Sequence, residues 1–158
     1  MTPKNLHRAA AGIEMFTWTL LIIAMILKYS GVTEAWVPVA GPIHGFGFLC
    51  FIVITVILWI NNHWPIRLGL LGLFVSLIPW AALPFTVLAD RAGRLEGGWR
   101  FRDTDEQPST LPDHGLAQMV RHPVRTGLIV LVVIAIVFAL LLTMGQPYDP
   151  DAIAETVN

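Results

Sequence analysis

Apolar residues along this chain are grouped into four long runs separated by polar segments. A transmembrane helix needs about 20 mostly apolar residues, because each residue adds about 1.5 Å across roughly 30 Å of hydrocarbon. Runs of this length cover residues 9–27, 39–60, 66–89 and 124–144. The pattern therefore predicts an all-α integral membrane protein, folded as a four-helix bundle.

The polar segments predict how these spans are connected. The turn Asn61–Pro65 is short, so the second and third spans should form an antiparallel hairpin. The segment from Asp90 to Pro123 is rich in Gly, Pro and charges of both signs, which is typical of an exposed loop. We expect one short helix within it, near residues 114–120. The bundle thus has a long polar loop between helices 3 and 4.

This pattern divides the chain into four parts. Residues 1–101 form a membrane core of three spans, residues 102–123 a polar loop, residues 124–145 a fourth transmembrane helix and residues 146–158 an acidic tail. Pro147 and Pro150 prevent continuation of the last helix into the tail. The first apolar run is longer than the core of a signal peptide, so we expect it to be a retained span.

Composition supports a membrane protein and argues against nucleic-acid binding. Apolar residues make up 55% of the chain and charged residues 13%, whereas soluble domains carry about 25% charged residues. The net charge of −1 leaves no excess of cations to neutralise phosphates. The single cysteine, Cys50, allows no internal disulfide and no multi-cysteine metal site, so we expect a buried thiol.

The distribution of Lys and Arg predicts an orientation. Four spans would place both termini on one face with Lys4, Arg8 and Arg67, and the remaining seven Lys and Arg on the other. Positive residues accumulate on the cytoplasmic side, so this count favours a cytoplasmic 90–123 loop and external termini. The early charges Lys4 and Arg8 favour the opposite orientation.

Two ionisable residues, Glu14 and His44, fall inside predicted spans, where a central charge costs about 2.5–3.5 kcal/mol. Antiparallel spans would place them about 13 Å apart in depth, so we expect no direct contact. We expect an ion pair between Glu14 and Arg67. Asp90 and Arg91 end the third span near His44, and Asp90 should orient its ring. These residues are interpreted as structural contacts between helices, with a proton-handling or ligand role for Glu14 or His44 as the alternative.

Small residues form stripes on the second and third predicted spans. The stripes comprise Gly41, Gly45, Gly47, Gly69, Gly72 and Ser76. Such stripes let backbones approach, so these two helices should pack closely. Pro79 and Pro84 remove backbone donors within the third span and predict a kink there.

Cofactor chemistry finds little support in the sequence. His44 and His122 could together ligate a haem, but His122 precedes Pro123 at the end of a loop, outside a rigid helix. The other histidines show no metal-ligand spacing. No glycine-rich phosphate loop and no nucleophile with an adjacent base occurs. We therefore expect no catalytic residue, no cofactor and no metal, and a chain that is not an enzyme.

From Glu14 to Phe101 the order of features resembles a small bacterial membrane family, found in actinobacteria and in bacilli as YdzA-like proteins. It is known only as a domain of unknown function. The features are Glu14 in an aromatic-containing first span, its Lys28-Tyr29 end, the segment Gly41–Gly45, and a proline-bearing third span that ends at Asp90-Arg91. The resemblance implies a three-span protein with no established catalytic activity. This chain departs from it by Met15 in place of an expected Gly, and by the added loop and fourth span.

These features favour a non-catalytic accessory or assembly subunit of a larger membrane complex, whose partners are other integral membrane subunits and lipids. The actinobacterial resemblance suggests a respiratory supercomplex of cytochrome bc and cytochrome oxidase as the host. The alternative is a small transporter or channel, as a homo-oligomer, that uses Glu14 and His44. A membrane enzyme acting on lipid near His44, Asp90 and His122 is a third hypothesis.

Overall fold

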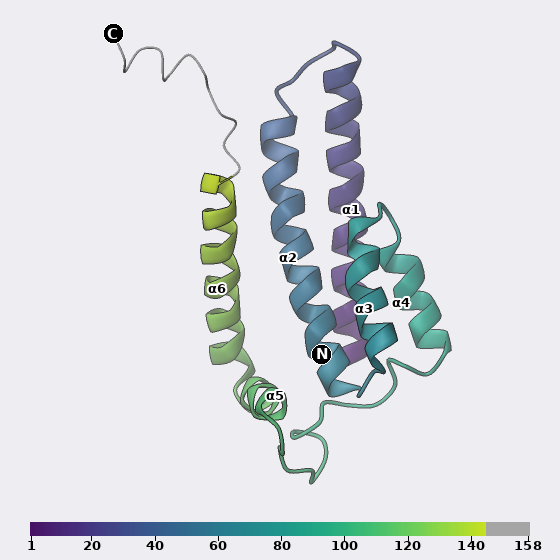
Figure 1. Cartoon of the computed structure of the whole chain (residues 1–158), viewed down its shortest axis with the longest axis vertical. Coiled ribbons are helices and arrows are strands. Elements are labelled where there is room, and N and C mark those ends of the chain that lie inside the picture. Colours follow the sequence, from purple (N-terminus) through teal and green to yellow (C-terminus); the bar gives the residue numbers. More distant parts are fainter. Residues whose placement is uncertain (145–158) are drawn as a thin grey trace.

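The computed structural model describes residues 1–144, which fold into a bundle of helices (Figure 1). The helices are α1 (Pro3–Tyr29), α2 (Val37–Asn61), α3 (Ile66–Phe74), the 3-10 turn η1 (Val75–Leu77), α4 (Ala82–Arg91), α5 (Leu111–Arg121) and α6 (Pro123–Met144). No strand occurs within this described part of the chain, so the predicted all-α class is confirmed. The predicted acidic tail, residues 146–158, lies outside the described residues.

Among residues 1–144, the helices long and apolar enough to cross a membrane are α1, α2 and α6. Helices α1 and α2 pack along each other as an antiparallel pair, and α6 stands beside α2 (Figure 1). Two glycines of α2 allow the neighbouring helices to approach closely. A Cβ at Gly47 would lie 3.3 Å from Oγ1 of Thr17 on α1, and one at Gly45 would lie 3.2 Å from the Phe138 ring on α6. The small-residue stripe of α2 therefore faces α1 and α6.

The predicted third span is wrong as a single membrane-crossing helix. Helix α3 has 9 residues and α4 has 10, so each covers only about 15 Å, half of the hydrocarbon thickness. Asp90 at the end of α4 pairs with Lys4 near the start of α1, whereas Ser76 in η1, just after α3, meets Trp18 halfway along α1. The segment is therefore a re-entrant hairpin that enters and leaves at one end of the bundle (Figure 1).

The hairpin turns at residues 78–81 because the chain cannot continue as a helix there. Ile78 is extended, with ψ of 121°, as expected for a residue that precedes a proline, and Trp80 has a positive φ of 61°. Two indoles hold the tip against α1. Trp18 Nε1 donates to the carbonyl of Ser76 at 3.3 Å, and Trp80 Nε1 donates to Thr19 Oγ1 at 2.9 Å. Pro79 thus ends a helix that the sequence predicted to be only kinked.

Helix α3 packs closely on α2 through Gly69 and Gly72, as predicted, but it meets larger side chains of α2 and not the small-residue stripe of that helix. A Cβ at Gly69 would lie 2.1 Å from Cδ2 of Trp59, and one at Gly72 would lie 2.9 Å from Cγ2 of Thr55. Backbone and aromatic ring therefore meet without an intervening side chain.

The segment between α4 and α5 is folded against the end of α2, although its composition predicted an exposed loop. Leu95, Trp99 and Phe101 are buried in the main hydrophobic cluster. The Arg100 guanidinium donates to the carboxylate of Glu106 at 2.8 and 2.9 Å, and to the carbonyl of Ile60 at 3.0 Å. This arginine ties the segment to the last turn of α2.

Helix α5 confirms the short helix predicted near residues 114–120, and it begins three residues earlier than predicted, at Leu111. The earlier start follows from its cap, because Thr110 and Asp113 form a reciprocal capping box. The Asp113 carboxylate also lies 3.2 Å from Nη1 of Arg100. The same arginine therefore fixes α5 as well as α2.

Candidate functional site: polar residues along helix α1

His7 is buried at the junction of three helices. Its Nε2 lies 3.3 Å from Oγ1 of Thr55 on α2, and its Nδ1 lies 3.0 Å from Oγ1 of Thr86 on α4. The rings of Phe51 and Trp64 lie against the imidazole, with centroids 5.4 and 5.9 Å away. The imidazole therefore joins the hairpin to the two long helices.

The hydroxyl hydrogen bonds around His7 define a neutral ring. Thr86 uses its one hydrogen to donate to the carbonyl of Ala82 at 2.7 Å, so its oxygen accepts from Nδ1–H of His7. The remaining nitrogen, Nε2, then accepts from the Thr55 hydroxyl. Every polar side-chain atom of this buried cluster is satisfied without a charge, which suits a position inside the membrane.

Glu14 lies two turns further along the same face of α1, about 16 Å from the start of the helix and so near the middle of the bilayer. Its side chain is fully buried, and neither carboxylate oxygen has a hydrogen-bond partner within residues 1–144. Oε2 lies 3.6 Å from the position of a Cβ at Gly47, so α2 approaches the carboxyl closely. A buried carboxyl without a hydrogen-bond partner is costly at this depth, so a partner or a functional role is expected for it.

His44 lies on α2, level with the turn of α1 that follows Glu14. Its Nδ1 is 3.2 Å from Oγ1 of Thr17, and its ring packs on Trp18 with centroids 4.2 Å apart. Thr17 in turn donates to the backbone carbonyl of Glu14 at 3.0 Å. The predicted depth separation of about 13 Å was wrong, because the register that pairs Thr17 with His44 leaves Glu14 and His44 only about 5 Å apart in depth.

The predicted and observed depth separations of Glu14 and His44 differ because of the connection between α1 and α2. His44 is about 10 Å from the start of α2, but its partner Thr17 is about 18 Å from the end of α1, at 1.5 Å per residue. Residues 30–36 therefore fold back beside the last turns of α1 before α2 begins. No pattern in the sequence indicates that residues 30–36 fold back along α1.

Asp90 lies at the opposite end of the bundle from His44 and does not orient its ring. It pairs with Lys4 at 2.7 Å and with the guanidinium of Arg8. Two cations of α1 therefore neutralise this carboxylate. The prediction failed because the re-entrant hairpin returns Asp90 to the face from which α3 starts.

The polar face of α1 and its partners on α2 and α4 all lie within one stretch of sequence. A family model described as a domain of unknown function (DUF3817) matches residues 4–91, which is more than half of the chain. The chain belongs to this family. The match ends at Arg91, the last residue of α4, so the DUF3817 segment comprises α1, α2 and the re-entrant hairpin.

A relative of this chain is a Streptomyces coelicolor protein, SCO5905, whose name describes it as a membrane protein. It is 34% identical over 87 residues, which make up 54% of this chain and 10% of the relative. The chain therefore spans a small fraction of the length of the curated relative that it matches. No solved structure matches the chain.

The remaining predicted residues of the DUF3817 segment lie apart from Glu14 and His44. Arg67 is exposed on α3, and the predicted ion pair with Glu14 is not formed. Arg91 is exposed at the end of α4. His122 caps α5 at the end of the bundle where α6 starts, far in depth from His44, so the two cannot share a haem.

His7 was not predicted as part of a buried polar cluster. One signal was available: His7 precedes Glu14 by seven residues, which puts both on one face of a helix. Thr55 and Thr86, by contrast, carry no sequence signal, because threonine is common in apolar helices. Within residues 1–144, no three His, Cys, Asp or Glu side chains are grouped as metal ligands.

Proposed function

We propose that this protein is a non-catalytic accessory or assembly subunit of a larger membrane protein complex. The main support is the size of the relative, because the 87 matched residues make up 10% of that membrane protein. A membrane segment that forms a small part of a longer relative is expected to work beside other membrane-embedded parts.

Helix α6 supports the same proposal. Ile134 is the buried residue of this helix, and the faces away from α2 are apolar and exposed, as at Val132. In a membrane these faces meet lipid or helices of another subunit. A respiratory supercomplex of cytochrome bc and cytochrome oxidase is the first host to test, on the actinobacterial resemblance.

The test is purification from native membranes in mild detergent, through a tag on Asn158, with identification of co-purifying proteins. We expect at least one integral membrane partner in a fixed ratio to this chain. Val132→Trp should reduce partner recovery, whereas Ile23→Trp, on the exposed face of α1, serves as a matched control. Recovery of a homogeneous homo-oligomer without other proteins would contradict the proposal.

The alternative of a small transporter or channel gains one observation. Glu14 carries two buried oxygens without partners among residues 1–144 and lies one turn from the Thr17–His44 contact, so two proton-binding groups share a layer. Proton flux into liposomes containing the purified chain would favour this alternative if Glu14→Gln abolished it and Glu34→Gln, at the exposed connection between α1 and α2, did not. The subunit proposal expects no flux above that of empty liposomes.

We infer an orientation from the same arrangement of helices. Three spans and a re-entrant hairpin gather nine of the ten Lys and Arg at one end of the bundle, leaving Lys28 at the other. The nine are Lys4, Arg8, Arg67, Arg91, Arg94, Arg100, Arg102, Arg121 and Arg125. Positive residues resist translocation, so this end faces the cytoplasm. The N-terminus is then cytoplasmic and α6 ends outside, in place of the two external termini expected from four spans.

A further inference from the structure

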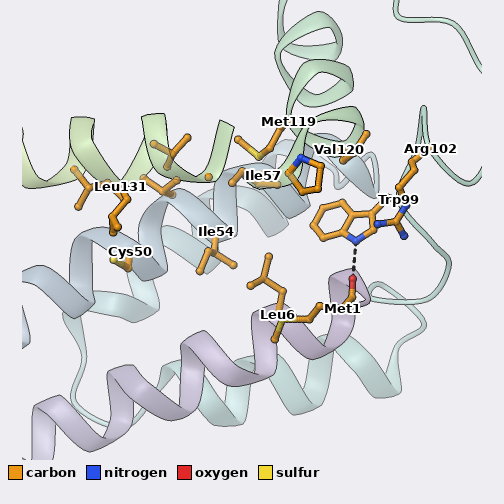
Figure 2. A pocket seen from close by; sticks show the side chains of 15 residues that line it. Met1, Leu6, Cys50, Ile54, Ile57, Trp99, Arg102, Met119, Val120 and Leu131 are labelled. Carbon is orange, nitrogen blue, oxygen red and sulfur yellow. Dashed lines mark hydrogen bonds between the residues drawn. The ribbon is translucent and has the colours of Figure 1, made fainter. Parts of the chain in front are cut away.

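An apolar cavity of about 470 Å³ lies between α1, α2, α5 and α6. Figure 2 shows Leu6 of α1, Ile54 and Ile57 of α2, and Leu131 of α6 around the space, with Trp99 and Arg102 at one end. Almost all of the side chains that line it are apolar. The lining therefore suits an apolar ligand such as a hydrocarbon chain.

The depth of the cavity matches one leaflet of a bilayer. Its lining on α6 runs from Pro123 to Ile134, which is about 16 Å of helix. The hydrocarbon core is roughly 30 Å thick, so the cavity extends from the membrane surface to its middle. Cys50 on α2 lines the deep end, about two turns of helix beyond Ile57.

The mouth of the cavity lies at the basic end of the bundle. In the described chain, nine Lys and Arg and six Asp and Glu gather at this end, a formal excess of three positive charges. Arg102 lines the mouth and uses Nε and Nη2 to bind Asp103, each at 2.8 Å. A guanidinium has five N–H donors, so Nη1 is left to bind a further anion.

We propose that this cavity binds one acyl chain of an anionic phospholipid, with the phosphate near Arg102. The length of the cavity, which matches the depth of one leaflet, and the positive charge at its mouth both fit this ligand. Trp99, which donates from Nε1 to the carbonyl of Met1 at 2.9 Å, closes the mouth at the level of the headgroups. The site is independent of the subunit proposal, since lipid can be bound with or without a partner.

The test counts bound phosphatidylglycerol on the full chain by native mass spectrometry, after purification in mild detergent. We expect one tightly retained molecule per chain. Gly127 lines the cavity, and a Cβ added there would meet no atom within 4 Å, so Gly127→Leu fills the space without a clash. Retention should fall about tenfold or more, because each buried methylene lost changes affinity roughly fourfold.

Matched variants distinguish loss of lipid from the cavity from a general effect of a larger side chain on the protein. Gly12→Leu makes the same change at a glycine of α1 with equally open surroundings, outside the cavity lining, and should retain the lipid. Arg102→Gln should bind phosphatidylglycerol and phosphatidylcholine alike. Equal loss in the Gly12 and Gly127 variants would overturn the proposal, as would wild-type protein that shows no preference for the anionic lipid.

Cys50 gives a second readout, because it is the one cysteine of the chain and lines the deep end. A small maleimide should label it slowly with phosphatidylglycerol bound and several-fold faster after the lipid is removed in detergent. If the thiol stays protected after complete delipidation, the cavity is closed by protein, such as a helix of a second copy, and the proposal is wrong.

Discussion

At the scale of single residues, the interior of this protein contains two polar layers, which differ in whether their side chains have hydrogen-bond partners. The His7 layer is complete, since both ring nitrogens meet threonine hydroxyls from other helices. The Glu14 layer is incomplete, since its carboxyl oxygens have no partner within residues 1–144. A satisfied layer is a structural device, whereas an unsatisfied one is where function or partner contact is expected.

Thr86→Val should destabilise the protein by about 1 kcal/mol, because the Nδ1–H of His7 then loses its acceptor in a buried site. Thermal unfolding in detergent measures the effect, with Thr143→Val, on the exposed surface of α6, as the control. The double variant His7→Phe with Thr86→Val should lose less than the two single changes together. A loss equal to their sum would argue against the hydrogen bond.

At the scale of elements, the hairpin of α3 and α4 depends on contacts that sequence patterns do not contain. Its length and composition allow a full span, and the apolar run that it belongs to was predicted as one. Pro79 permits the reversal, and the indoles of Trp18 and Trp80 hold the tip at mid-membrane. The close approach of Gly69 to Trp59 then fixes α3 on α2.

Gly69→Ala should loosen the hairpin by about 1–3 kcal/mol, because the new methyl group would overlap the Trp59 ring and force it to move. Gly12→Ala adds the same methyl group where no atom lies within 4 Å and should be tolerated. Unfolding in detergent compares the two variants. Equal stability of both would show that the ring can move freely and that this contact does not fix α3.

The segment between α4 and α5 should resist proteolysis until the pH becomes strongly acidic. The hydrogen bond from Arg100 lowers the pKa of Glu106 from 4.5, and that from Thr110 lowers the pKa of Asp113 from 3.8. Folded-state pKa values below the unfolded ones stabilise the segment above pH about 4.5, and this stabilisation is lost as the pH falls through the lowered values.

Pepsin cleavage between residues 92 and 110, followed as the pH is lowered, checks this expectation. Glu106→Gln should be cut faster than the wild type at pH values above the lowered pKa of Glu106, because Arg100 then loses one of its two carboxylate partners, and at the same rate below it. Asp105→Asn, at an exposed neighbouring position, corrects for the pH dependence of the protease itself. Cleavage that does not differ between the two variants would show that the Arg100 ion pair does not hold the segment.

At the scale of the whole molecule, the re-entrant hairpin sets the topology. Asn62 donates to the carbonyls of Arg94 and Glu96, so the end of α2 and the segment after α4 lie side by side. Three helices long enough to span, α1, α2 and α6, then lie between the start of α1 and the end of α6. The basic residues gather at one end only because the hairpin does not cross.

Single cysteines in a Cys50→Ala background test this topology with a membrane-impermeant thiol reagent. Pro65→Cys and Glu96→Cys should be protected in intact cells and labelled after lysis, because both lie at the basic end, which we propose to be cytoplasmic. Val32→Cys, in the exposed connection between α1 and α2, should be labelled in intact cells. Labelling of Pro65→Cys and Glu96→Cys from opposite sides would restore four full spans.

Hydropathy along the chain was enough to predict that this protein is helical and lies in a membrane, because the length and polarity of an apolar run are local properties. It also located α1, α2, α6 and the short helix α5. Three features required the packed structure: residues 66–91 reverse within the membrane, Asp90 binds Lys4 and Arg8, and Glu14 lies beside the Thr17–His44 contact. They depend on which helices pack together and in what register, and hydropathy does not record either.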